Sequence, residues 1–500
     1  MPGRPPDSSA NASGSQVGSL AGNAMGTKDL VFTVLAALAP LTLIVAVAPL
    51  HFLKGGAAVP GGYLVAGVVM ALFAVGFMTM SRYVRNAGAF YATVSRGLGK
   101  PAGSGAAMLA IVAYNALQIS TYGALGVYAT ETFKNYFHRD VPWWVFAIVG
   151  LVFVGWLGYR GIHTSARILG ALLVLETAVL VVLAVYVLVK GGVGDWSAES
   201  FAPTRVFDSG NGAMFALVAG AFMGFEATAI FSEEARGGIR TVRRATYIAV
   251  GFIAVFYAFI TWVVVMAYGV DKIAAAAEAD PVNLVVAVFD RYVPAPITEV
   301  MHILLLTSAF AALLALHNAA NRYFYAMGRE GLLPRPLGRT HPRTKAPWTA
   351  GLVQTVLAAA AIVVFAVFGI DPYLGLLLWG SALGFLGIIC LWALCSLAII
   401  RFLRREAPDA GIFRTTIAPG LSFAALAVVL FLVLSSLPLL TGAGTATNLL
   451  IVGLGVAAVV AGVARALYLR ARAPRLYAGL AQTSVDEPPA GRREPVTGNA

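Results

Sequence analysis

The feature that most constrains this chain is a series of unbroken apolar runs, many of them about twenty residues or longer. A run of that length can cross the hydrocarbon core of a bilayer as an α-helix. A membrane-spanning β-strand would instead alternate polar and apolar residues. The runs therefore predict a helical bundle. Twelve apolar segments can be delimited: 30–53, 62–81, 104–129, 143–159, 166–189, 212–232, 246–268, 297–327, 347–368, 373–400, 417–440 and 447–469.

Composition supports the same class of protein. Hydrophobic residues make up 59% of the chain and charged residues only 12%, whereas soluble proteins carry about 25% charged residues. This is too little charge to cover a water-exposed surface, and the apolar excess also excludes a disordered chain. We therefore predict an all-α polytopic membrane protein with twelve transmembrane helices.

The distribution of basic residues predicts the orientation. Counting both tails and the loops after segments 2, 4, 6, 8 and 10 as one side, that side holds 28 of the 35 Lys and Arg residues. Short loops with this bias lie in the cytoplasm. We expect a multi-pass protein of the plasma membrane with both termini cytoplasmic. Its partners are the lipid bilayer and a small-molecule substrate, and no nucleic acid, because no soluble domain carries the basic residues on one face.

Two predicted helices are interrupted near the middle of the membrane. The first contains Pro40, which removes a backbone hydrogen bond. The sixth contains Gly220 and Gly224, followed by Glu226. Each interruption alone is compatible with a kink or a packing face. Because these helices would begin two runs of five helices in opposite orientations, the pair predicts an inverted repeat with a substrate site at the breaks.

Short motifs in four loops and helix ends follow one another in a fixed order. They are Asn86-Ala87-Gly88-Ala89-Phe90-Tyr91 with Gly97-Leu98-Gly99, Gly161 through Ser165-Ala166-Arg167, Gly224-Phe225-Glu226-Ala227 through Ser232-Glu233-Glu234-Ala235-Arg236 with Arg243-Arg244-Ala245, and Asn321-Arg322 through Met327-Gly328-Arg329-Glu330-Gly331-Leu332-Leu333-Pro334. Together they resemble the amino acid–polyamine–organocation (APC) superfamily of secondary transporters, over residues 27–403. The resemblance implies a LeuT-like five-plus-five inverted repeat with two extra C-terminal helices, and alternating access to a site between helices 1, 3, 6, 8 and 10.

The expected organisation has five parts. They are a disordered cytoplasmic tail (1–26), a first five-helix repeat (27–190), a second, inverted repeat (191–403), helices 11 and 12 (404–473) and a second disordered cytoplasmic tail (474–500).

The two breaks predict how a zwitterionic substrate binds. Its carboxylate would lie at a half-helix N-terminus, where the helix dipole is positive, and its ammonium would meet freed backbone carbonyls. The predicted substrate-binding residues are Ala39, Pro40, Leu41 and Thr42 in helix 1, Asn115 and Gln118 in helix 3, and Gly220, Ala221, Met223 and Glu226 in helix 6. The Pro-x-Thr break departs from the glycine-rich break of much of the family and resembles that of its putrescine importers or of an actinobacterial-type group of permeases. A polyamine would favour Glu176 or Glu226 instead.

Glu176 lies eleven residues into helix 5, near the membrane centre. Ionisable groups at this depth are functional by default, and the resemblance places Glu176 where some sodium-independent relatives carry a lysine. We predict that it couples transport to protons; the alternative is a structural carboxylate bonded to hydroxyls. For Glu226, substrate contact and a latch to the helix 6 backbone both remain open.

Other polar residues inside the membrane have two interpretations. Asn115 and Gln118 lie on one face of helix 3, where they could line the pathway or hydrogen-bond between helices. Thr307 and Ser308 in helix 8 could complete the ion-coupling site, or they could be packing residues. His317 is more often a core histidine than a proton carrier.

The residue pattern favours a transporter over an enzyme. Cys390 and Cys395 form no metal or redox motif, and the histidines do not cluster, so we predict no catalytic residue, no cofactor and no metal. A channel would show rings of charge or a repeated pore motif, and a membrane-embedded transferase would show clustered carboxylates or histidines in its loops. We predict a secondary active transporter of an amino acid, with H⁺ as the coupling ion or by exchange. The alternative is a polyamine or organic amine importer.

Overall fold

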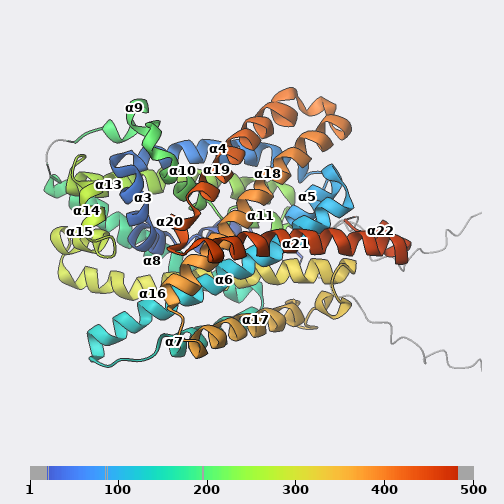
Figure 1. Ribbon diagram of the computed structural model, residues 1–500, viewed down its shortest axis with the longest axis horizontal. Coiled ribbons are helices and arrows are strands. Elements are labelled where there is room, and N and C mark those ends of the chain that lie inside the picture. Colours follow the sequence, from blue (N-terminus) through green and yellow to red (C-terminus); the bar gives the residue numbers. More distant parts are fainter. Residues whose placement is uncertain (1–19, 21, 85, 87, 194–195, 482–500) are drawn as a thin grey trace, which may run out of the picture.

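The computed structural model describes residues 20, 22–84, 86, 88–193 and 196–481. In this part of the chain the regular structure is helical, and an isolated β-bridge joins Met25 to Ala235. Residues 1–19, 21 and 482–500 of the predicted tails, and Ala87 of the first motif, lie outside the described residues. Figure 1 shows the helices arranged as one elongated bundle, with most of the long helices running close to its long axis.

The first half of the bundle contains eleven α-helices within the described residues. They are α1 (Thr27–Ala37), α2 (Pro40–Thr42), α3 (Ala48–Gly55), α4 (Val59–Met80), α5 (Ala89–Leu98), α6 (Lys100–Phe137), α7 (Trp143–Arg160), α8 (Ile162–Lys190), α9 (Pro203–Val206), α10 (Gly212–Gly220) and α11 (Ala227–Ile230).

The second half contains another eleven in the described part. They are α12 (Ile239–Phe252), α13 (Ala258–Tyr268), α14 (Ile273–Ala279), α15 (Leu284–Tyr292), α16 (Ala295–Glu330), α17 (Trp348–Val367), α18 (Gly380–Glu406), α19 (Ala418–Ser435), α20 (Leu437–Thr441), α21 (Thr445–Arg472) and α22 (Pro474–Gly479).

Short stretches of other helix types connect or interrupt the α-helices. The π-helical stretches are Leu43–Val47, Ile253–Tyr257, Pro372–Trp379 and Phe413–Ile417, and the 3₁₀ turns are Gly56–Ala58, Glu199–Phe201, Ser209–Asn211, Phe231–Glu233, Arg335–Gly338 and Pro408–Ala410.

Each predicted apolar segment is largely helical, but the count of uninterrupted spans differs from twelve. Ten helical stretches of the described chain are long and apolar enough to cross a membrane. Thr27–Met80 is one of these stretches, although it turns at Gly56–Ala58 between α3 and α4. The predicted segment 212–232 is divided into α10 and α11, each too short to span alone. The chain is therefore a multi-pass membrane protein.

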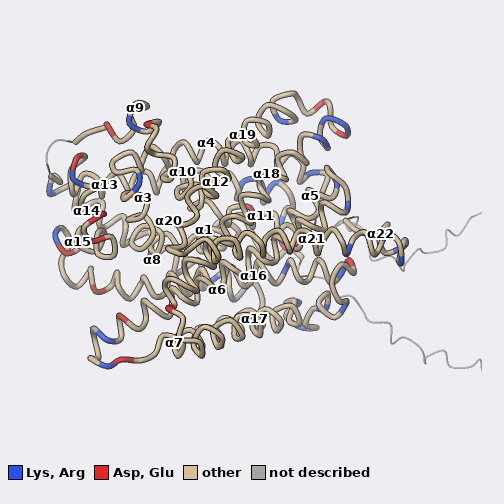
Figure 2. Tube along the Cα trace, viewed as in Figure 1, with Lys and Arg blue, Asp and Glu red and all other residues tan. Residues whose placement is uncertain are grey.

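Charged residues gather at the two ends of the bundle, while its middle is mostly uncharged (Figure 2). Large apolar side chains such as Val152 and Phe153 on α7, and Leu352 and Val356 on α17, are exposed along the sides. Apolar side chains exposed between two charged ends are typical of a surface that faces lipid. The long axis of the bundle is thus the direction in which the helices cross the membrane.

The centre of the bundle is built on α6, which packs against α16, α18 and α21. This helix has 38 residues, about 57 Å at ~1.5 Å per residue. Because the hydrocarbon core is only about 30 Å thick, α6 extends beyond it or crosses it at a tilt. It also provides one wall of the cavity described below.

The described parts of the two predicted tails, which adjoin the bundle, are packed against it. Ala24 and Met25 donate backbone hydrogen bonds to the Glu234 carbonyl (2.8 and 2.9 Å), and Met25 is fully buried. At the other end α22 is helical and Leu480 is fully buried. Residues 22–26 and 474–481 are therefore packed segments, because they bury apolar side chains such as Met25 and Leu480. These single apolar residues stand among Gly and Ala, so they form no apolar run that the sequence analysis could detect.

Candidate substrate cavity between two broken helices

The predicted break in helix 1 is present and lies directly before Pro40. Helix α1 ends at Ala37, and Ala39 adopts a left-handed conformation (φ 43°, ψ 70°) before Pro40 begins α2. A residue that precedes proline is disfavoured in the α region, whereas proline itself fits the first position of a helix. The sequence therefore ends one helix and starts another at this point.

The predicted break in helix 6 is also present. Helix α10 ends at Gly220 and α11 starts at Ala227, with turns between them. Gly224 has φ 111°, which a residue with a side chain rarely adopts. A Cβ on Gly224 would lie 3.6 Å from the Cβ of Ala37, so the two breaks face each other.

A cavity of about 410 Å³ lies where the two breaks meet. Its walls come from the broken helix 1 (residues 37–54), α6, α10 with the turn that follows it, α16, α18 with the preceding π-helical stretch, and α20. The predicted substrate residues that line the cavity are Ala39, Thr42, Gly220, Ala221 and Met223. Those that do not line it are Pro40, Leu41, Asn115, Gln118 and Glu226.

Several backbone carbonyls at the two breaks have no donor among the described residues, that of Ala37 included. Those of Leu38, Ala221 and Met223 accept no hydrogen bond from any described residue, and all three residues line the cavity. The carbonyl of Gly220, predicted to be free, instead accepts a hydrogen bond from the Met223 N–H (3.0 Å). The Thr42 hydroxyl is buried, without a described partner, and supplies a donor nearby.

The rest of the lining is mainly apolar. Leu117 on α6, Leu316 on α16 and Phe385 on α18 contribute large apolar side chains. None of the described side chains that line the cavity is acidic, whereas His51 and Lys54 on α3 are basic. The cavity therefore offers neutral acceptors at the breaks and an apolar wall opposite them.

Glu226 lies beside the break and bonds to the protein itself. It is fully buried, accepts a hydrogen bond from the Tyr114 hydroxyl (2.6 Å) through one oxygen, and accepts one from the Gly224 N–H (3.0 Å) through the other. The Gly224 bond fixes the shape of the turn between α10 and α11. This geometry corresponds to the latch interpretation of Glu226.

Glu176 on α8 is placed at the other break. It is fully buried, and it accepts a hydrogen bond from the Ser308 hydroxyl of α16 (2.7 Å). Ser308 in turn accepts one from the Thr42 N–H (3.3 Å), at the start of α2. The structure thus brings Glu176 and Ser308 together at the break in helix 1. Thr307 lies apart from them, since its hydroxyl donates to the Leu304 carbonyl of its own helix (3.0 Å).

Asn115 and Gln118 lie away from the cavity. Asn115 donates back to the Ile111 carbonyl of its own helix (2.7 Å). Gln118 is fully buried between α6, α16 and α17, where it contacts His317 (3.3 Å) and Gln354. Both geometries match the packing interpretation of these residues.

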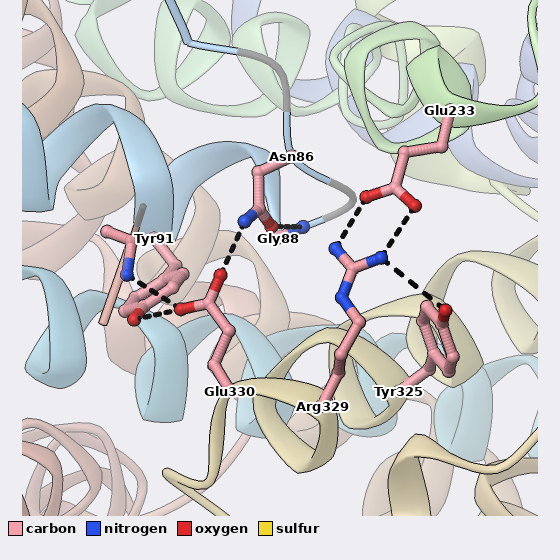
Figure 3. A network of polar contacts seen from close by, with 8 residues as sticks. Asn86, Gly88, Tyr91, Glu233, Tyr325, Arg329 and Glu330 are labelled. Carbon is pink, nitrogen blue, oxygen red and sulfur yellow. Dashed lines mark hydrogen bonds and ion pairs between the residues drawn. The ribbon is translucent and has the colours of Figure 1, made fainter. Parts of the chain in front are cut away.

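A network of ion pairs and hydrogen bonds closes the end of the bundle opposite His51 and Lys54. Arg322 on α16 forms a two-point ion pair with Glu234 (2.5 and 2.9 Å), both side chains being almost fully buried. Arg329, two turns further on, pairs with Glu233 in the same way (Figure 3). Since both glutamates follow the break in helix 6, these pairs tie that segment to α16.

The sequence interpretation passed over several polar residues of the cavity. His51 lines it and hydrogen-bonds to Tyr63 (2.9 Å), and Tyr128 and Tyr373 stand in its walls. A scattered histidine and tyrosines on different helices leave no spacing pattern. The ion pairs had a clearer signal, because Glu233, Glu234, Arg322 and Arg329 all belong to the motifs quoted above.

Comparison with known proteins gives one family and several relatives. The family model described as amino acid permease matches residues 25–459. An uncharacterized transporter of Mycobacterium tuberculosis (strain ATCC 25618 / H37Rv) is 34% identical over 140 residues, which are 28% of this chain and 31% of that relative. The chain thus spans under a third of that relative's length.

Two relatives with named substrates match longer stretches. The branched-chain amino acid permease BcaP of Lactococcus lactis subsp. cremoris (strain MG1363) is 27% identical over 328 residues, 61% of this chain and 68% of the relative. The low-affinity putrescine importer PlaP of Escherichia coli (strain K12) is 24% identical over 239 residues, 46% and 52% of the two chains. The family match over residues 25–459 shows that this chain belongs to the amino acid permease family, as its resemblance to the APC superfamily predicted.

Proposed function

We propose that this protein is a secondary active transporter that moves an amino acid with an apolar side chain across the plasma membrane by alternating access, coupled to protons. The proposed architecture has twelve spans. The turn at Gly56–Ala58 separates spans 1 and 2, and α10 with α11 forms the broken sixth span. Two five-helix repeats of opposite orientation then place both breaks at the same depth.

The observation that carries this proposal is the set of free polar groups at the two breaks. The ammonium group of an amino acid needs hydrogen-bond acceptors, which the free carbonyls of Leu38, Ala221 and Met223 supply. The carboxylate needs a donor, which the Thr42 hydroxyl supplies beside the positive start of α2. A volume of about 410 Å³ falls in the range of about 300–1,000 Å³ typical of small-molecule sites.

The chemistry of the walls favours an amino acid over a diamine. A diamine carries two ammonium groups and needs a second negative or carbonyl-rich region, yet the described lining has no carboxylate. Glu176 and Glu226, the two carboxylates considered for a polyamine, bond to Ser308 and Tyr114 and lie outside the lining. The apolar wall around Leu117 and Phe385 fits a hydrocarbon side chain, and BcaP is named for branched-chain substrates.

The sidedness of the cavity supports alternating access. Lys54, Tyr373 and Leu440, which line it, adjoin loops that the charge distribution places outside. The ion pairs of Arg322 and Arg329 lie at the end that this distribution places in the cytoplasm. We therefore assign the structure to a state that is closed on the cytoplasmic side, and an inward-facing state must break these pairs.

Glu176 is the proposed proton carrier. Its hydrogen-bond chain through Ser308 ends on the Thr42 N–H, and Thr42 is one of the residues that line the cavity. Loss or gain of a proton at Glu176 changes the negative charge held against the start of α2. The charge of this residue is thus linked to the conformation of the break where substrate binds.

Substrate-induced thermal stabilisation of the purified protein tests the binding site. Leucine should raise the melting temperature of the parent, and putrescine should not. Thr42→Val keeps the side-chain shape but removes the hydroxyl, so it should weaken leucine binding about tenfold or more, because hydrogen bonds to charged groups are worth ~1.5–3 kcal/mol. Thr355→Val is the matched control, since Thr355 bonds to its own helix and lies outside the cavity. Stabilisation by putrescine alone, or equal leucine affinity in both variants, would refute the proposed site.

A further inference from the structure

We propose that residues 474–481, which we call the C-terminal strap, hold the cytoplasmic side of this transporter closed through Glu330. The strap begins with α22, directly after the long helix α21. It ends at Ala481, whose backbone N–H donates to Glu330 Oε2 (2.7 Å). The proposal rests on the alternation of access proposed above and adds a part of the chain to it.

Glu330 is the last residue of α16 and joins three separate segments. Its Oε1 accepts a hydrogen bond from the Asn86 side chain (2.6 Å). Its Oε2 accepts two, one from the Tyr91 hydroxyl (2.5 Å) and the one from the Ala481 N–H. Figure 3 shows Asn86 and Tyr91 converging on this carboxylate. The residue is almost completely buried, and its two oxygens connect the loop before α5, α5 itself and the strap.

The strap is anchored at two further points. Lys100, at the start of α6, donates to the carbonyls of Tyr477 (2.9 Å) and Ala478 (2.6 Å), and its ammonium lies 5.2 Å from the Tyr477 ring centre. A cation beside the last carbonyls of a short helix caps it favourably. Leu476 packs on Gly331, directly after Glu330, so closely that a Cβ on this glycine would lie 2.8 Å from a Leu476 methyl carbon.

The position of Glu330 links the strap to the ion pairs that close the same end. Arg329, the preceding residue, pairs with Glu233 on the segment that follows the break in helix 6 (2.7 and 2.9 Å). Opening the cytoplasmic side must separate these two side chains. Because the strap bonds to Glu330, it holds the end of α16 in the position from which Arg329 reaches Glu233.

Ala481 offers two substitutions with opposite effects. Its φ of 59° lies in the left-handed region, which costs a residue with a side chain about 1–2 kcal/mol and glycine almost nothing. Ala481→Gly should therefore strengthen the strap. Ala481→Pro removes the N–H that Glu330 accepts and cannot adopt a positive φ, so it should release the strap.

The test measures how fast a cysteine at position 229 reacts with a water-soluble thiol reagent added from the cytoplasmic side. Ala229 lies on α11 and is 5% exposed in this structure, so we expect a cysteine there to react faster once the cytoplasmic side opens. Cys390 and Cys395 are first replaced by serine. The Ala481→Pro variant and a chain ending at Ala473 should both label about tenfold faster than the parent. This factor corresponds to the free energy lost with one hydrogen bond to a charged group. Ala481→Gly should label about fivefold more slowly, and a chain ending at Ala481 should match the parent.

A Glu234→Gln variant separates the strap from the proposed function. If Glu234→Gln labels faster while the strap variants all match the parent, the strap is only a packed segment and the proposal is wrong. If no variant, Glu234→Gln included, changes the labelling rate, the alternation of access is wrong and the strap proposal fails with it. The melting temperature of each variant shows whether it has kept the fold. If a strap-releasing variant has lost it, the labelling rate of Ala481→Gly decides whether the proposal stands.

Discussion

The buried ion pair between Arg322 and Glu234 should control opening on the cytoplasmic side. Its side chains are 2–3% exposed, and the guanidinium also donates to the Asn318 carbonyl (2.5 Å) and lies 4.5 Å from the Phe231 ring centre. Glu234→Gln keeps the shape of the side chain but leaves the positive charge of Arg322 buried without its counter-charge. Breaking a buried pair in this way costs about 3–5 kcal/mol.

This cost falls mainly on the closed state, because an opened cytoplasmic side admits water to the guanidinium. The equilibrium should therefore shift toward the open state by about two to more than three powers of ten. Labelling of a cysteine at position 229 measures this shift, and the melting temperature of the purified protein should fall at the same time. The labelling rate is the decisive quantity, since a purely structural pair would lower only the melting temperature.

The matched control is Glu199→Gln. Glu199 pairs with Arg205 at a similar distance (2.8 Å), but both side chains are exposed, and exposed pairs are worth only about 0–1 kcal/mol. This variant should match the parent in both measurements. If Glu234→Gln labels no faster than Glu199→Gln, the pair does not hold the cytoplasmic side closed and our assignment of the closed state is wrong.

Three further predictions address the breaks, the coupling and the orientation. Ala39→Gly should raise the melting temperature, because it removes the left-handed strain of about 1–2 kcal/mol at φ 43°. Pro40→Ala should permit a continuous helix and abolish leucine-induced stabilisation. Equal stabilisation in the parent and Pro40→Ala would mean that the proline is only a kink. Glu176→Gln should still exchange substrate across liposome membranes but lose proton-driven accumulation, and unchanged accumulation would make Glu176 structural. Single cysteines within 191–205 and 334–345 should react from outside and inside respectively, and the reverse pattern would overturn the twelve-span topology.

The spans and their interruptions could be predicted because the bilayer imposes strong local rules. An apolar run of sufficient length must form a helix in lipid, and Pro40 must disturb one. Gly224 provides the conformation that the second break uses. These properties belong to single residues or to short windows, so the sequence alone displays them.

The partners of buried polar groups could not be predicted, because they depend on which helices meet. Nothing in the sequence pairs Glu226 with Tyr114, separated by 112 residues, or Glu330 with Ala481, separated by 151. The Gly220 carbonyl shows that sequence reasoning could locate the break but not the individual carbonyls that it leaves without a donor. Its helical bond is lost as expected, but Met223 reaches it instead, so the free acceptors are its neighbours.

Uptake by the purified protein in liposomes tests the central claim most directly. A panel of amino acids and amines, including leucine and putrescine, should be offered with an inward proton gradient and an inward sodium gradient imposed separately. Our account predicts saturable accumulation of leucine or a similar apolar amino acid with the proton gradient and little with the sodium gradient, and faster uptake when the liposomes are preloaded with that substrate. Accumulation of putrescine without any amino acid, or uptake that neither saturates nor responds to preloading, would contradict it.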